Sequence, residues 1–148
     1  MKKFRFTLEP VGTMRDLQEM RARDAFATAI QQETACAAAL ARQQLCLAEF
    51  VTALIERRST GLPGALQVTF MRAYVDEIGR ERTAGAALAK AQQAREVARQ
   101  RWIDAHLQVN LIQKLRGRAK ERHATEVVRF DQRQMDDRAP RGSLFPES

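Results

Sequence analysis

The side chains of this 148-residue chain that could carry out chemistry are few and far apart. Cys36 and Cys46 are ten residues apart in one predicted helix, a separation of roughly 15 Å at about 1.5 Å per residue. A disulfide bond between them would require the helix to unfold. His106 and His123 belong to no CxxC or HxxxH pattern. We therefore expect two buried or half-buried thiols and no metal site.

Two pairs of neighbouring carboxylates remain as candidates for acid–base chemistry: Asp76 with Glu77, and Asp136 with Asp137. Both pairs fall on the flank of a predicted helix with no pocket around them, so we interpret them as solvated surface charge. The sequence contains no phosphate-binding GxxxxGK[ST] loop, GxSxG elbow, HExxH pair or EF-hand loop. We expect neither an enzyme nor a bound cofactor.

Positive charge is the strongest chemical signal in the chain, which has a formal net charge of +7 and a pI of about 10.2. One short segment, which we call the basic segment, concentrates it against a single acid, Glu121: Lys114, Arg116, Arg118, Lys120 and Arg122. Apolar Val127, Val128 and Phe130 follow. Two interpretations remain open, a surface that binds an acidic partner and a solvated basic helix that frays.

The elements that position these residues are indicated by the helix breakers. No Pro or Gly lies between Thr13 and Arg58, Gly61, Pro63 and Gly64 then occur together, and no further Pro precedes Pro140. We predict an all-α single domain over 1–148. Its parts are an N-terminal arm (1–12), a first helix (13–58), a turn (59–64), a second helix (65–138) and a disordered tail (139–148).

A short turn makes its two helices antiparallel neighbours, so the chain should form a coiled-coil hairpin. From Phe26 onward, apolar residues of the first helix alternate at spacings of three and four, with polar Glu33, Gln43 and Arg57 interrupting the seam. The first-helix markers are Met14, Leu17, Phe26, Ala29, Cys36, Leu40, Leu47, Phe50 and Leu54. The second-helix markers are Met71, Tyr74, Ile78, Leu88, Trp102, His106, Val109, Ile112, Val127 and Phe130.

The turn predicts that residue i faces roughly residue 122 minus i, with Phe50 and Leu47 near Met71, Tyr74 and Val75. Cys36 would then face Gly85, where glycine would serve close packing. Because the second helix is longer, we expect it to overhang and to lack an intramolecular partner beyond about residue 112. Gly117 would be a flexible point in this overhang.

No run of about 18 apolar residues is seen, and residues 1–9 are basic without an apolar signal core. We expect a chain that begins in the cytoplasm and is not inserted in a membrane.

Two short patterns mark the ends of the chain: KFRFTLE at residues 3–9, followed by Arg15, and Met135 with Asp136 and Asp137. The first resembles the KFxFxLE opening, and the second the acidic MDE ending, of the flagellar export protein family FliJ. Trp102 in a basic helical context and the single hinge are also similar, so that the resemblance covers nearly the whole chain. Pro10 and Gly12 depart from the family pattern and leave the start of the first helix open.

The resemblance implies a non-enzymatic stalk of a bacterial type III export apparatus that serves flagellum biogenesis and motility. It implies a cytoplasmic protein, associated with the inner membrane only through that apparatus. The implied partners are the hexameric export ATPase, the cytoplasmic domain of the export gate (FlhA in flagella) and export chaperones. No nucleic-acid partner is expected.

The resemblance also suggests contact residues. The basic segment would pair with acidic loops of the ATPase ring, and Val127 and Phe130 would add an apolar anchor. The gate would contact an apolar stripe soon after the turn, where Phe70, Tyr74 and Ile78 lie on one helical face. The competing interpretation is that Tyr74 and Ile78 pack in the seam.

Three alternatives stay open. Injectisome stalks of the YscO type share the architecture, a basic coiled coil could bind nucleic acid along its phosphates, and a generic adaptor could lie on a membrane surface. Interleaved Asp and Glu over most of the chain argue against nucleic acid.

Overall fold

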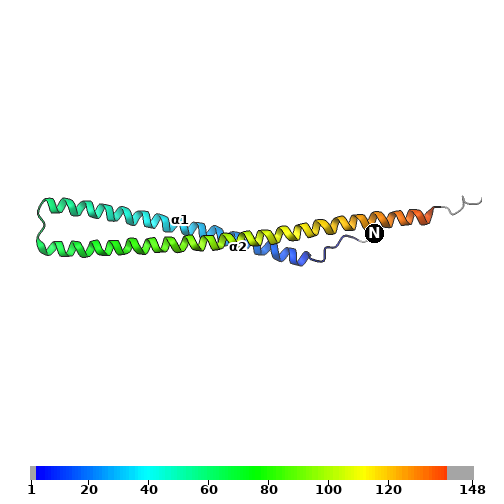
Figure 1. Cartoon of the computed structure of the whole chain (residues 1–148), viewed down its shortest axis with the longest axis horizontal. Helices are drawn as coiled ribbons and strands as arrows, with labels where there is room; N and C mark the ends of the chain where they lie inside the picture. Colours follow the sequence, from blue (N-terminus) through cyan, green and yellow to red (C-terminus); the bar gives the residue numbers. More distant parts are fainter. Residues whose placement is uncertain (1–2, 140–148) are drawn as a thin grey trace, which may run out of the picture. The chain divides into compact units, whose positions relative to one another are not determined.

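The computed structural model describes residues 3–139 of the chain. Two helices account for nearly all of them, α1 (Glu9–Ser59) and α2 (Gly64–Arg138), and the described part contains no strand. Figure 1 shows the two helices running side by side away from the turn that joins them. The predicted all-α helical hairpin is confirmed.

The turn between α1 and α2 is built by its glycine and proline. Gly61 has a φ of 89°, in the left-handed region that a side chain disfavours, and its N–H bonds to the Arg58 carbonyl at 3.4 Å. The Pro63 carbonyl accepts the N–H groups of Leu66 at 3.0 Å and Gln67 at 3.2 Å. These bonds use the free polar groups at both helix ends, so the chain reverses direction within residues 60–63.

The contacts within the chain define two units, each of which takes a part of both helices. One unit is Met20–Asp104, which contains the turn; of the described residues, the other joins 3–19 to 105–139. We call them the turn unit and the terminal unit.

The seam of the turn unit follows the predicted alternation of three and four residues. All the predicted seam residues of α1 from Phe26 onward are half-buried: Phe26, Ala29, Cys36, Leu40, Leu47, Phe50 and Leu54. The core is nevertheless thin, because Ala91 is the only hydrophobic side chain of this unit that counts as buried, at 9% exposure. Stability must therefore be spread along the seam.

Aromatic and polar pairs set the register of this seam. Phe26 stacks on Trp102 with ring centroids 6.0 Å apart, and the Glu33 carboxylate lies 3.2 Å from the Arg95 guanidinium. Nearer the turn, the Gln43 side-chain amide donates to the Glu77 carboxylate. Polar layers of this kind weaken packing but discriminate against shifted registers.

The observed register differs slightly from the expected one. The residues that contact each other across the seam of the turn unit have numbers that add to between 120 (Phe50 with Phe70) and 128 (Phe26 with Trp102), which centres on about 124 rather than 122. Tyr74 does meet Phe50, but Met71 and Val75 are 45% and 61% exposed. These two residues directly follow the seam residues Phe70 and Tyr74, and because one residue turns the helix by about 100°, their side chains lie off the seam.

One seam position of α1 was misassigned, because Arg57 is exposed and lies outside the seam over the Phe70 ring. The markers Met14, Leu17 and His106 are exposed as well. Phe130 is exposed, as expected for the part of α2 that overhangs. A Cβ placed on Gly85 would meet nothing within 4 Å, so this glycine does not serve close packing.

In the terminal unit, α1 begins earlier than predicted. The helix starts at Glu9 instead of Thr13, because Pro10 lies in the first turn, where its missing N–H costs nothing. Gly12 is buried, and a Cβ there would lie 3.1 Å from Ile112 Cγ2. Val109 and Ile112 are buried at 5% and 9% exposure, and Glu19 contacts His106 at 2.9 Å.

The N-terminal arm therefore comprises residues 3–8 in the described structure, and it packs along α2. Phe4 lies against His123, with ring centroids 5.5 Å apart. We expected α2 to lack an intramolecular partner beyond about residue 112, and this is wrong for the stretch up to His123. The arm lies outside the helices, but its Phe4 and Phe6 rings contact α2 there. From Val128 to Ala139 every residue is exposed.

At the C-terminal end, α2 reaches Arg138, as predicted, and the Ala139 N–H still bonds to the Met135 carbonyl at 2.9 Å. The predicted disordered tail, apart from Ala139, lies outside the described residues.

By length and composition alone, α1 passes the test for a helix that could cross a membrane, contrary to the expectation from the sequence. One such helix is weak evidence, because core helices of soluble proteins pass the same test. Here the seam face of α1 carries Glu33 and Gln43, whose partners come from α2.

The glycines yield a test of this fold. A Cβ at Gly79 meets nothing within 4 Å, so Gly79→Ala should raise the free energy of unfolding by about 0.5–1 kcal/mol through helix propensity. Gly61→Ala, at φ 89°, should lower it by about 1 kcal/mol or more. Urea unfolding followed by circular dichroism measures both, and equal effects of the two variants would contradict the turn geometry.

Candidate functional site

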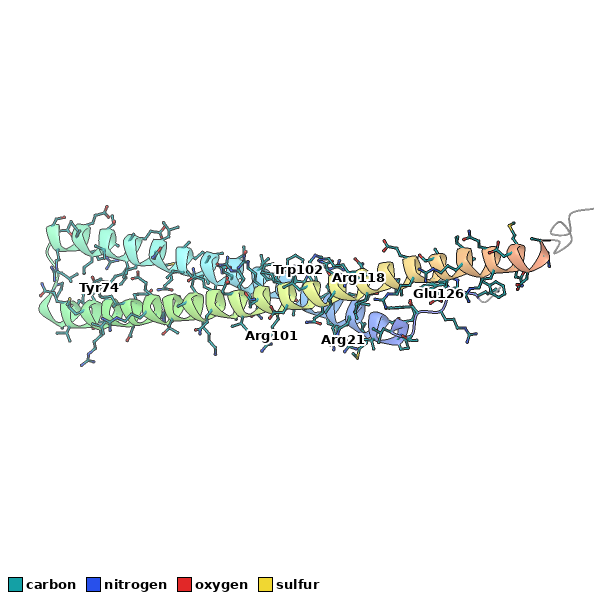
Figure 2. All side chains as sticks on the ribbon, turned by 45° about the vertical axis from the view of Figure 1, so that its right-hand side comes forward. Arg21, Tyr74, Arg101, Trp102, Arg118 and Glu126 are labelled. Carbon is teal, nitrogen blue, oxygen red and sulfur yellow. The ribbon has the colours of Figure 1, made fainter. Side chains whose placement is uncertain are left out.

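Within the basic segment, one side chain contacts the start of α1 and the other four are exposed to solvent. Lys114, Arg118, Lys120 and Arg122 are exposed on α2, whereas Arg116 is half-buried and turned toward the start of α1. Arg118 is labelled on α2 in Figure 2. The exposed four present long cationic side chains to solvent, the chemistry that pairs with carboxylates or phosphates.

Arg116 makes two interactions within the terminal unit. Its Nη2 lies 2.8 Å from Glu9 Oε1, and its guanidinium carbon lies 5.7 Å from the Phe6 ring centroid. Its side chain is 33% exposed. The alternating pattern of the arm predicted that Phe4 and Phe6 share one face, but nothing in the sequence indicated that Arg116 would be the partner of Phe6.

After the basic segment, the exposed apolar residues of α2 are not the expected pair of Val127 and Phe130. Val127 is half-buried, while Phe130 is 53% exposed. Val128 and Met135 are more exposed still, at 62% and 74%. Seven residues separate these two, so they lie on one face of α2 after two turns. Of the predicted anchor pair, only Phe130 is freely available.

A shallow groove also lies on this part of α2. It is lined by Arg118, Glu121, Arg122, Thr125, Glu126 and Arg129. Arginine and glutamate alternate around it, so the positive charge of the basic segment is partly offset within one turn. The arrangement suits a mixed-charge protein surface better than a row of phosphates.

The predicted stripe of Phe70, Tyr74 and Ile78 is half-buried in the turn unit. Phe50 of α1 lies between two of its rings, with centroids 6.3 Å from Phe70 and 6.4 Å from Tyr74. Arg57 lies over the Phe70 ring at 5.7 Å. Tyr74 therefore lies between the helices (Figure 2), as the seam interpretation expects.

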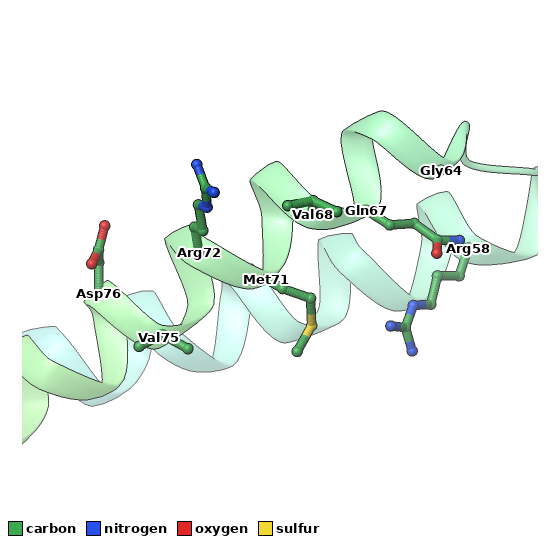
Figure 3. Close-up of a pocket in the computed structure, with 8 residues that line it drawn as sticks. All are labelled: Arg58, Gly64, Gln67, Val68, Met71, Arg72, Val75 and Asp76. Carbon is green, nitrogen blue, oxygen red and sulfur yellow. The ribbon is translucent and has the colours of Figure 1, made fainter.

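An exposed apolar groove runs beside that stripe, and sequence reasoning missed it. We call it the turn groove; it is lined by Arg58 from α1 and by Gly64, Gln67, Val68, Met71, Arg72, Val75 and Asp76 from α2. In Figure 3, Arg72 and Asp76 project to one side of α2 and Met71 to the other. Val68, Met71 and Val75 follow a spacing of three and four that the sequence displays, but we had assigned a single apolar stripe to each helix.

A second shallow groove, lined by Val75, Asp76, Gly79, Arg80, Thr83, Ala84 and Ala87, shares Val75 and Asp76 with the turn groove. Small residues line its far end, where another backbone could approach closely. Together the two grooves give α2 a continuous outer face that α1 leaves uncovered.

The side chains that could hold a metal ion are scattered over the described residues. Among residues 3–139, no three His, Cys, Asp or Glu side chains lie close enough together to hold a metal ion. Cys36 is half-buried and Cys46 exposed, and neither forms a disulfide. What the structure does assemble is charged and apolar surface on helices.

The fold defines the class of this protein as an all-α coiled-coil hairpin, with a basic segment on α2 and an exposed apolar groove beside the turn. A comparison with family models is more specific: the model of the flagellar FliJ protein matches residues 4–144. The chain belongs to this family, which confirms the resemblance seen at its two ends. Comparisons with curated proteins and with solved structures found no match.

Membership of this family supports a role as a stalk component of the flagellar protein export apparatus, in flagellum biogenesis. The family is one of structural export components and is not known for enzymes. Because the matching model is the flagellar one, it favours the flagellar system over the YscO-type injectisome.

Near the turn, truncating a side chain in the seam should lower the free energy of unfolding more than truncating one in the exposed groove. Phe50→Ala removes the ring that contacts both Phe70 and Tyr74, and should cost about 1–3 kcal/mol in the free energy of unfolding. Val68→Ala, on the exposed groove, should change it by no more than about 0.5 kcal/mol. Urea unfolding decides, and a larger loss for Val68→Ala would overturn the assignment of the seam.

Proposed function

We propose that this chain is a non-enzymatic stalk that binds the hexameric export ATPase and the export gate and supports the delivery of export chaperones. Its place would be the cytoplasm, at the inner face of the inner membrane through the export apparatus. The observation that carries the proposal is the family match over residues 4–144 in a chain whose two helices form a hairpin.

The ATPase contact is proposed on the C-terminal part of α2. Exposed Lys114, Arg118, Lys120 and Arg122 offer cations to acidic loops of the ring, and Phe130 supplies an apolar contact. Arg116 and Val127 belong to the same set, but both are half-buried and would contribute less in this arrangement. The mixed charge of the groove beside them supports a protein partner.

The gate contact is proposed on the turn unit. Phe70, Tyr74 and Ile78 remain the candidate stripe, and the neighbouring turn groove supplies exposed apolar area that this stripe lacks. A docking helix could bury Val68, Met71 and Val75 and contact the edge of the stripe without opening the seam. Chaperones are expected partners through the same apparatus, and no particular surface is assigned to them.

The ATPase contact can be tested by charge reversal on the exposed residues alone. The triple variant Arg118→Glu, Lys120→Glu, Arg122→Glu should weaken ATPase binding and stimulation about tenfold or more, since each exposed pair contributes about 0.5 kcal/mol. Pull-down and ATP-hydrolysis assays with the export ATPase measure this.

The matched control reverses three exposed arginines on α1, with the same change in net charge: Arg21→Glu, Arg23→Glu and Arg42→Glu. Equal losses in both triple variants would reduce the effect to net charge. Binding to duplex DNA that falls steeply with salt, without ATPase binding, would instead support the nucleic-acid alternative. Liposome flotation tests the membrane-surface alternative.

The gate contact predicts a separate loss. Met71→Asp places a charge in the turn groove and should lower affinity for the gate's cytoplasmic domain about tenfold or more, because an apolar contact becomes a desolvated carboxylate. Calorimetric titration measures it, with ATPase binding retained. Met14→Asp, at a residue of similar exposure in the terminal unit, is the control; full gate binding by Met71→Asp would exclude the groove.

A further inference from the structure

The N-terminal arm, residues 3–8, is the one segment of the described chain that packs on a helix without belonging to one. It lies within the terminal unit and follows α2 over the stretch that includes the basic segment. Its two rings, Phe4 and Phe6, are half-buried, while Lys3, Arg5 and Thr7 are exposed. The alternation is that of an extended segment with one face against a surface.

The arm and the first helical residue engage two side chains on one face of α2. Arg116 and His123 are seven residues apart, or two helical turns. Phe4 lies against the His123 ring at 5.5 Å, and Phe6 lies under the Arg116 guanidinium at 5.7 Å. Glu9 completes the set with a 2.8 Å contact to Arg116 Nη2.

These contacts hold the arm on α2 through side chains alone. The backbone hydrogen bonds of residues 3–8 in the described structure lead to the start of α1 instead: the Glu9 N–H bonds to the Phe6 carbonyl at 3.2 Å, and the Gly12 N–H bonds to the Leu8 carbonyl at 2.9 Å. The Glu9 carboxylate is 56% exposed, so water reaches its ion pair with Arg116 and weakens that pair. The arm could therefore leave α2 without breaking the hydrogen bonds of either helix.

The Arg116 guanidinium is the group that a carboxylate of an acidic partner would bind. A carboxylate and an aromatic ring already occupy its guanidinium, and a partner's carboxylate would have to replace Glu9. The neighbouring exposed cations could still attract such a partner while Arg116 remains held.

We infer that residues 3–9 form a displaceable clasp on α2, which competes with acidic partners for Arg116 and so restrains binding to the basic segment until the arm is released. In its consequence for the export ATPase, the inference rests on the proposed function. The competition itself concerns only this chain and any polyanion.

The first test loosens the clasp without changing net charge. The double variant Phe4→Ala, Phe6→Ala in the full chain should bind poly-L-glutamate about threefold more tightly, as expected for one cation gained at a solvent-exposed site. Thr7→Ala, on the exposed face of the same arm, should leave affinity unchanged. Fluorescence anisotropy with labelled poly-L-glutamate measures the affinities of the native chain and of both variants. Circular dichroism checks that the helices persist.

The carboxylate can be tested separately. Glu9→Gln frees Arg116 but also adds one unit of net charge, so its matched control is Asp16→Asn, which removes an exposed acid from the same helix. Affinity for poly-L-glutamate should rise more for Glu9→Gln than for Asp16→Asn. Equal gains would show that only net charge matters.

The third test closes the clasp covalently. In a background of Cys36→Ser and Cys46→Ser, the variant Phe4→Cys, His123→Cys is joined by a reducible bis-maleimide linker. The closed chain should bind poly-L-glutamate and the export ATPase more weakly than the same chain after reduction. The single variant Phe4→Cys carrying the same linker controls for its bulk.

The outcomes distinguish a failure of the clasp from a failure of the proposed ATPase contact. If the loosened, closed and native chains bind poly-L-glutamate equally, the clasp is overturned. If poly-L-glutamate shows the expected order but the ATPase binds no form of the chain, the clasp stands and the proposed ATPase contact fails.

Discussion

The narrow apolar seam between α1 and α2 is the constraint on which the remaining structure depends. Each helix contributes one apolar stripe at spacings of three and four to this seam, and neither stripe could be covered by its own helix. The Gly61–Pro63 turn brings the second stripe back against the first. Because three hydrophobic side chains in the described chain count as buried, many small contacts must share the task of holding the helices together.

Such a seam gains its specificity from residues that weaken it. Glu33 with Arg95 and Gln43 with Glu77 place polar groups where leucine would pack better. A shift in register would separate each pair and leave its members facing apolar neighbours, which costs more than the pairs contribute. The large aromatic pair of Phe26 and Trp102 adds a steric constraint in the same direction.

A thin seam also leaves most of each helix available to other molecules. The turn groove and the basic segment are both surfaces that α1 leaves exposed, one apolar and one cationic. Among the described residues, no three His, Cys, Asp or Glu side chains lie close enough together to hold a metal ion. A stalk component of the flagellar export apparatus, the role that membership of the FliJ family supports, is compatible with such exposed helix faces.

The sequence by itself determined the two helices, their turn and most of the seam, because helix breakers and periodicity are local properties of the chain. Phe26 to Leu54 fell on the seam as predicted, and the KFRFTLE opening indicated the family. The tertiary structure alone decided the start of α1 at Glu9 and the exposure of Met71. It also decided the partner of Arg116. All three features depend on which surface of α2 packs against the rest of the chain. Charge and spacing identify a basic segment, but only packing distinguishes the arginine held by Glu9 and Phe6 from its neighbours in solvent.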